Sequence, residues 1–170
     1  MAVSARLPED MTTKTRARTD SAQQELKELQ LRPGFLLRRA HQVSSALFME
    51  ATTALNVTTT QFGMLTILAA REPIDQIGIA KLMRLDRSTT GLVVKNLEDR
   101  ALIERVTDPE DRRRRLLRLT AEGRRLLQAV KQPAKAAHDR GLSVFNAEEA
   151  KSFIALLTRF VDGNDSERQS

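Results

Sequence analysis

Apolar residues recur at steps of three and four in several stretches of the chain, which is the spacing of amphipathic helices. The first stretch runs from Phe35 to about Leu55 and follows Pro33-Gly34, a pair that marks a break in the chain. Thr58 followed by Gln61 fits a capping box, so a second helix is predicted to start there and to end before Pro73. We expect this helix to bury Phe62, Leu65, Ile67 and Leu68.

Two short helices are predicted next, from Asp75 to Arg84 and from Asp86 to about Arg100. An aspartate stands at the N-cap of each, where its carboxylate can accept from the first free backbone N–H groups. Because almost no linker separates them, the pair is typical of a helix-turn-helix. In the first of these helices the inward residues are expected to be Ile77, Ala80 and Leu82.

A β-hairpin is predicted directly after the helix-turn-helix. Residues 102–106 form its first strand, residues 107–111 its turn and residues 116–119 its returning strand. The turn is followed by four consecutive arginines, Arg112, Arg113, Arg114 and Arg115. A basic run alone favours a solvated loop, but at the tip of a hairpin beside a recognition helix it favours contact with the minor groove of DNA.

Two helices are predicted after the hairpin. Thr120 caps the first, and Pro133 is expected to kink or break it because proline removes an interior hydrogen bond. Asn146 and Glu149 resemble a second capping box, which starts a helix to about Val161. This last helix carries more apolar surface than one side of a small domain needs. It is either part of the core of its own chain or, as we prefer, a dimer interface built with the helix at residues 35–55.

The predicted fold class is therefore mostly α with a small β-wing, a winged helix-turn-helix joined to a helical dimerisation region. Residues 1–32 are expected to be a partly disordered arm, either loosely docked or reinforcing a dimer. The remaining boundaries are 33–57 and 121–164 for the dimerisation region, 58–120 for the DNA-binding domain and 165–170 for a tail.

Composition supports a partner that is a polyanion. The 170 residues carry a formal net charge of +6, although a merely soluble basic protein has the same property. Aromatic residues make up only 4%, which disfavours proteins that stack single-stranded bases on aromatic rings. There is no cysteine, which excludes disulfides, zinc-thiolate sites and thiol chemistry.

We expect no metal, no cofactor and no catalytic residue. Only His41 and His138 offer imidazole, and no phosphate loop, HExxH or GxSxG motif is present. No apolar run approaches the roughly 18 residues of a membrane span, so a cytoplasmic protein with no membrane partner is expected.

One face of the second helix of the helix-turn-helix carries residue types that suit a major groove. Small, hydroxylated and cationic side chains fall together there: Arg87, Ser88, Gly91 and Lys95, with Thr89 at the same end. Arginine and serine can reach base edges, and glycine permits close approach. The alternative is a solvated face with incidental charge.

The same segments resemble the MarR family of winged-helix regulators. The resemblance is carried by Leu85-Asp86-Arg87-Ser88-Thr89-Thr90, by residues 97–105 and by Asp108-Pro109-Glu110-Asp111-Arg112-Arg113, and it covers roughly residues 34–162. It implies that Asp111 supports the wing and that Arg113 reaches the minor groove. One departure is Ala101, where the family usually has glycine.

The resemblance also implies a homodimer, a near-palindromic double-stranded operator and a small effector. With two-fold symmetry the half-sites lie about 10 base pairs apart. The effector is expected to be a small organic anion, an aromatic carboxylate or its acyl coenzyme A thioester. The candidate lining is Arg38, Arg39, His41, Gln42, Ser45, Phe48 and Met64. Each has a plainer alternative, in that the arginines can be solvated or salt-bridged and His41 can be an ordinary surface or core residue.

The sequence therefore predicts a ligand-responsive transcription regulator, and repression is favoured over activation. A constitutive or architectural DNA-binding protein without an effector is the alternative, since it shares the charge and the wing.

Overall fold

The computed structural model describes residues 21–167 of the chain. They fall into two units, residues 21–43 and residues 44–167, each described by itself. Of the predicted arm, residues 1–20 lie outside the described range, whereas residues 21–30 form a helix. Helix α2 (Pro33–Ala51) follows, and Pro33 stands at its first position, where a missing N–H costs no hydrogen bond.

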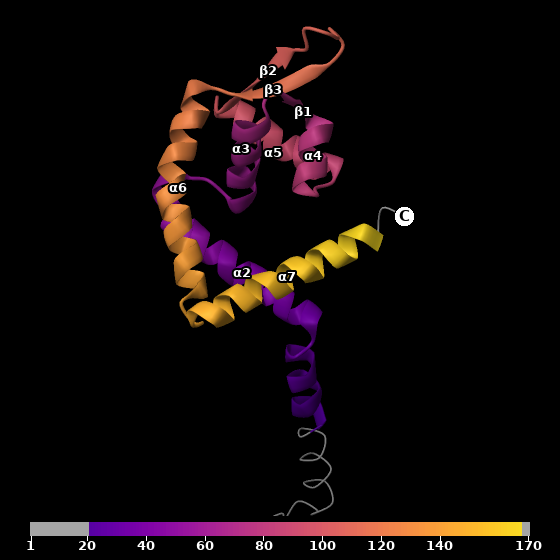
Figure 1. Ribbon diagram of the computed structural model, residues 1–170, viewed down its shortest axis with the longest axis vertical. Helices are drawn as coiled ribbons and strands as arrows, with labels where there is room; N and C mark the ends of the chain where they lie inside the picture. The colour runs from indigo at the N-terminus through magenta and orange to yellow at the C-terminus, as the bar shows by residue number, and fades with distance from the viewer. Residues whose placement is uncertain (1–20, 168–170) are drawn as a thin grey trace, which may run out of the picture. The chain divides into compact units, whose positions relative to one another are not determined.

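The second unit contains a winged lobe and two long helices. Its elements are η1 (Thr53–Leu55), α3 (Thr59–Arg71), β1 (Ile74–Asp75), α4 (Gln76–Met83), α5 (Arg87–Asp99), β2 (Ile103–Thr107), β3 (Arg115–Leu119), α6 (Ala121–Leu142) and α7 (Ala147–Glu167). The strands form one antiparallel sheet in the order β1-β3-β2. The predicted fold class is confirmed, although β1 was not predicted. Figure 1 shows the hairpin of β2 and β3 extending beyond the helices of the lobe.

The predicted N-caps are all present. Thr58 and Gln61 form a capping box, with the Thr58 hydroxyl accepting from the Gln61 N–H at 3.2 Å. Asp75, Asp86 and Thr120 accept from the backbone three residues on, at 2.7, 2.8 and 3.0 Å. Asn146 and Glu149 pair in the same reciprocal way at the start of α7. These side chains fix where each helix starts.

The first long helix is shorter than predicted, because α2 ends at Ala51 and not near Leu55. The buried Thr52 hydroxyl lies 2.8 Å from the Phe48 carbonyl and 3.3 Å from the Val57 carbonyl. It thus bonds both to the helix and to the chain that turns away from it. A short 3-10 turn and a left-handed Asn56 complete the change of direction.

The core of the lobe is closed by fully buried side chains from α3, α4, α5 and β3, among them Leu65, Ile79, Val94 and Leu117. The predicted inward face of α4 was partly wrong. Ile77 and Leu82 are 63% and 51% exposed, whereas Ile79 is buried. Ile79 and Met83, four residues apart, face the core instead.

Helix α6 runs without a break through Pro133, so the predicted break was wrong. A second core cluster accounts for this, because it holds α6 on both sides of the proline. Val130 before it and Ala137 after it are buried against Phe48 and Val57. Packing on both sides offsets the free-energy cost of the lost backbone hydrogen bond. Helix propensity alone does not include this tertiary packing, so it predicts a break.

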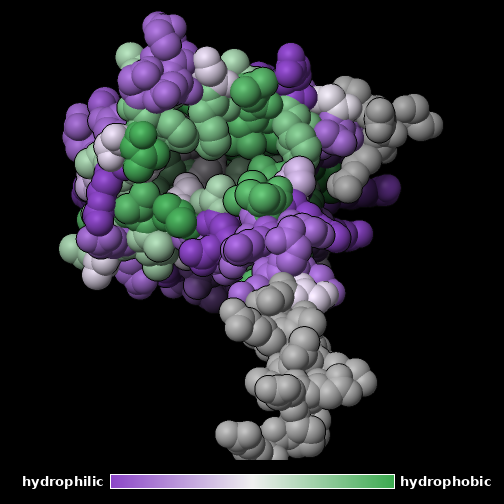
Figure 2. Space-filling model, turned by 90° about the horizontal axis from the view of Figure 1, so that it is seen from below, coloured by the Kyte–Doolittle hydropathy of each residue, from purple (hydrophilic) through white to green (hydrophobic). Residues whose placement is uncertain are grey.

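Helix α7 leaves its apolar side chains largely uncovered. Exposed fractions lie between 39% and 56% for Phe153, Ile154, Leu156, Leu157, Phe160 and Val161. The core of its own chain therefore does not cover this helix face. Figure 2 shows that apolar side chains make up much of the surface on the side seen there. Neither α7 nor any other helix within residues 21–167 combines the length and the apolar run needed to cross a membrane.

Ala101, the departure from the family pattern, has a left-handed backbone with φ of 54°. This conformation costs a residue with a Cβ roughly 1–2 kcal/mol, while glycine adopts it freely. We expect Ala101→Gly to stabilise the protein by about 1 kcal/mol and to raise the melting temperature by about 2–4 °C. Thermal unfolding followed by circular dichroism at fixed protein concentration measures this. Asn56→Gly is the control, since asparagine tolerates its φ of 47° and a smaller gain is expected. An unchanged or lower melting temperature for Ala101→Gly would contradict the strain.

Candidate nucleic-acid interface

Helix α5 starts on a dense set of polar contacts. The Asp86 carboxylate accepts from the Thr89 N–H at 2.8 Å and from the Thr89 hydroxyl at 2.6 Å. These bonds, the hydroxyl first, hold the pKa of Asp86 below its ordinary value. The same aspartate thus fixes both the start of the helix and the orientation of Thr89. Thr89 is therefore half-buried and engaged with its own helix, although its oxygen can still accept.

The two faces of α5 differ in burial. Thr90, Val94 and Leu97 are buried, whereas Arg87, Ser88 and Lys95 are exposed and Gly91 is half-buried. Within residues 21–165, Arg87 and Lys95 form no ion pair. An exposed face with two uncompensated cations and small polar residues between them can approach a polyanion closely.

A network behind α5 was missed by sequence reasoning. The Arg105 guanidinium on β2 donates to the Glu98 carboxylate at 2.8 Å and to the Gln76 amide oxygen at 3.3 Å. It thereby ties the first residue of α4 and the end of α5 to the hairpin. Gln76 and Arg105 are 29 residues apart in sequence, so no local pattern predicts their contact.

The wing loop, residues 108–114, is closed by its own backbone and by two aspartates. The Asp111 carboxylate accepts from the Arg113 N–H at 2.9 Å, and its carbonyl accepts from the Arg114 N–H at 2.9 Å. Asp108 accepts from the Glu110 N–H at 2.9 Å, and its own N–H donates to the Arg114 carbonyl at 3.1 Å. Asp111 therefore lies where it can support the hairpin.

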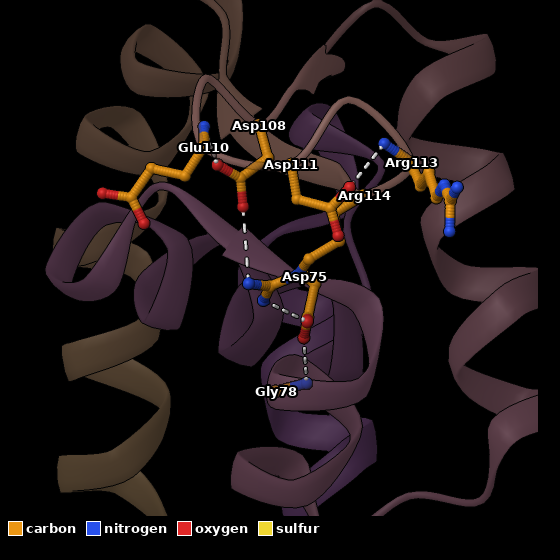
Figure 3. Close-up of polar contacts among 7 residues, drawn as sticks. All are labelled: Asp75, Gly78, Asp108, Glu110, Asp111, Arg113 and Arg114. Atoms are coloured by element: carbon orange, nitrogen blue, oxygen red, sulfur yellow. Dashed lines mark hydrogen bonds and ion pairs between the residues drawn. The ribbon is translucent and has the colours of Figure 1, made fainter.

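The four consecutive arginines differ in their surroundings. Within the described part of the chain, the side chains of Arg112 and Arg113 are exposed and have no ion pair or hydrogen bond. Arg115 donates to the Thr107 hydroxyl across the hairpin. Arg114 donates to Asp75 at 2.8 Å and lies 3.4 Å from an Asp108 oxygen. Figure 3 shows the Arg113 side chain directed away from this pair of carboxylates.

The contact between Asp75 and Arg114 shifts the pKa values of both groups. The pKa of Asp75 lies below its ordinary value, first because the Gly78 N–H donates to it and then because Arg114 does. The pKa of Arg114 is raised, chiefly by the hydrogen bond to Asp75. Its positive charge is therefore compensated within the protein, whereas Arg112 and Arg113 have no such partner among the described residues.

The predicted ligand-lining residues divide into two groups. Arg38, Arg39, His41 and Gln42 are exposed on α2, with Arg38 over the Phe35 ring at 4.9 Å and Arg39 donating to Gln42 at 3.2 Å. Ser45 is half-buried, while Phe48 and Met64 are buried in the two core clusters. Core packing thus accounts for Phe48 and Met64 without a ligand.

Comparison with known proteins places this arrangement among transcription regulators. The model of the MarR family matches residues 57–114, which run from the start of α3 through the wing loop. The chain is 30% identical over 133 residues to the HTH-type transcriptional repressor NicR of Pseudomonas putida, covering 78% of this chain and 84% of NicR.

Two solved structures are similar over most of their length. BpsR of Bordetella bronchiseptica, whose DNA binding is regulated by 6-hydroxynicotinic acid, is 28% identical with a TM-score of 0.74, covering 78% of this chain and 95% of BpsR. The transcriptional repressor CouR, solved on a 23-mer DNA duplex, is 27% identical with a TM-score of 0.74, covering 79% of this chain and 95% of CouR.

Proposed function

The chain belongs to the MarR family of DNA-binding transcription regulators, and from this we propose that it is a homodimeric repressor released from its operator by a small aromatic acid or its coenzyme A thioester. It acts by binding and not by catalysis. The observation that carries the proposal is the pairing of an exposed, cationic α5 face with a wing loop that bears two uncompensated arginines.

We assign the two elements to neighbouring grooves. Helix α5 presents Arg87, Ser88, Gly91 and Lys95 to the major groove, with Thr89 at the same end. Arg112 and Arg113 reach the adjacent minor groove, with Arg115 at the base of the loop. We choose Arg112 and Arg113 because neither forms an ion pair within the described chain. A guanidinium without a carboxylate partner is the one that a phosphate or base edge binds most readily.

The dimer is supported by helix α7. Six large apolar side chains on it are at least 39% exposed in the single chain, more than scattered surface residues account for. Covering them with a second copy removes this surface from water and places two recognition helices on one duplex. A two-fold dimer then selects a near-palindromic operator.

The effector proposal rests on charge and on similarity. Arg38 and Arg39 offer exposed guanidinium groups, which pair well with a carboxylate, and His41 and Gln42 lie beside them in sequence on the same helix. A relative of 28% identity is regulated by an aromatic acid, 6-hydroxynicotinic acid. Release requires that the ligand favour a conformation in which the two α5 helices no longer match their grooves.

The test is an operator selection followed by titration. The dimer is used to select duplexes from a random pool, and fluorescence anisotropy at 150 mM salt compares the selected duplex with a scrambled one. We expect a preference of at least about 10³-fold. Adding 6-hydroxynicotinate, 4-hydroxybenzoate or 4-hydroxybenzoyl coenzyme A is expected to weaken operator binding by about 5- to 150-fold for at least one compound. Equal affinity for both duplexes, with no effect of any compound, would instead indicate an architectural DNA-binding protein.

A further inference from the structure

Among the four wing arginines, Arg114 is the one with an ion pair to a residue outside the hairpin in the described chain. Its guanidinium joins Asp75, the N-cap of α4, to Asp108, the first residue of the wing loop. Asp75 uses its other carboxylate oxygen to accept from the Gly78 N–H at 2.7 Å. Figure 3 shows Arg114 between the two carboxylates. One side chain therefore connects the loop of the wing with the start of the helix-turn-helix.

Among the hydrogen bonds and ion pairs of the described residues, no other one joins residues 108–114 to α4 or its N-cap. The pairing of β1 with β3 covers only Ile74 with Leu117 and Asp75 with Leu116, so it holds the part of β3 nearest the loop and stops before the loop itself. The remaining hydrogen bonds of residues 108–114 within the described chain are internal to the loop. This pairing and the contact of Arg105 with Gln76 hold the strands, whereas the loop beyond them is held against the N-terminus of α4 by Arg114.

We propose that Arg114 is a positioning residue that holds the wing loop against the N-terminus of α4. It thereby sets the distance between Arg113 and helix α5, which is the helix proposed to enter the major groove. The inference rests on the proposed DNA contacts of α5 and the wing. Its consequence is that the minor-groove contact depends on an ion pair that touches no DNA.

The competing role for Arg114 is a direct contact with a phosphate. Burial opposes it, because the Asp108 side chain is only 10% exposed and would lose its cation if Arg114 turned outward. A mostly buried carboxylate without a partner is costly. Arg114 therefore keeps its carboxylates when DNA binds, while the uncompensated Arg112 and Arg113 enter the minor groove.

Two variants separate these roles. Arg114→Ala removes the link and a charge together. Asp75→Asn removes the link but keeps the cap, because asparagine caps helices as well as aspartate does, and it leaves the Arg114 charge in place. Glu110→Gln is the control, since it removes a negative charge from the same loop and its side chain points away from Arg114 (Figure 3).

The readouts are operator affinity over a salt series, hydroxyl-radical footprints and melting temperature, all with the full-length protein. Both Arg114→Ala and Asp75→Asn are expected to weaken operator binding roughly 5- to 30-fold. Protection of the minor groove under the wing is lost while protection of the major groove under α5 remains. The slope of log K against log salt stays at the wild-type value for both, and the double variant is no worse than either single one.

The phosphate-contact role gives opposite results. Asp75→Asn would then tighten binding at least as much as Glu110→Gln, because it frees a cation. Arg114→Ala would lower the slope by about 1.8 per dimer, at about 0.9 per lost contact. Either outcome overturns the positioning role while leaving the regulator intact. A wild-type protein with no operator preference would refute the proposed function itself.

Discussion

Replacing Gly123 by alanine is expected to destabilise the winged lobe by more than about 3 kcal/mol, the upper end of the usual cost of overpacking. A Cβ at this position would lie 2.0 Å from the Leu102 carbonyl oxygen, and this neighbour is backbone, not the end of a flexible side chain. That carbonyl already accepts from the Thr120 N–H at 3.1 Å. The start of α6 and the chain leaving α5 must therefore move apart.

The measurement is thermal unfolding by circular dichroism at one protein concentration, because the stability of a dimer depends on concentration. A loss of about 3 kcal/mol corresponds to a fall of roughly 6–12 °C in a chain of this size. Gly163→Ala is the matched control, since nothing lies within 4 Å of its added methyl group and it stands inside α7. It is expected to stabilise by about 0.5–1 kcal/mol. Equal melting temperatures for the two variants would show that the contact at Leu102 relaxes cheaply.

The features of this fold that depend on neighbours in sequence could be predicted from the sequence. An N-cap acts over three residues, so Thr58, Asp75, Asp86 and Thr120 could be assigned from their positions alone, and the structure confirms them. The hairpin also follows from a local pattern, a turn between two short apolar runs. These elements are enough to identify a winged helix-turn-helix.

The features that depend on tertiary contacts could not be predicted. Strand β1 has only two residues and exists because β3 pairs with it. Pro133 does not break α6, because a core cluster holds the helix on both sides of it. The inward and outward faces of α4 were partly misassigned. A helix of eight residues has too few apolar positions to show from sequence which side faces the core.

The candidate site shows the same limit. The residue pattern does not distinguish the four arginines, and only the family resemblance singles out Arg113. The fold compensates Arg114 with two carboxylates and leaves Arg112 and Arg113 without any in the described chain. One of those carboxylates, Asp75, is 39 residues away in sequence. Which arginine is available for DNA is thus decided by a contact that no local pattern contains.

The second large effect is expected at the wing tip, where Arg113→Ala should weaken operator binding by about tenfold or more. The arginine is exposed and uncompensated, and its N–H is held by Asp111, so the loop already presents its side chain before DNA arrives. Removing it from both wings of the dimer eliminates two cations that lie in the minor groove between the phosphates of the two strands. The salt slope should therefore fall by about 1.8, at about 0.9 for each lost contact.

Arg125→Ala is the control for this experiment, because it removes the same charge from a residue on α6 that already pairs with Glu122. Its slope and affinity are expected to stay close to the wild-type values. If Arg113→Ala and Arg125→Ala weaken binding equally, only net charge matters, and the wing makes no localised contact. If Arg113→Ala alone lowers the slope, the loss is local, and the guanidinium of Arg113 lies in the minor groove between the phosphates, as its lack of a partner among the described residues predicts.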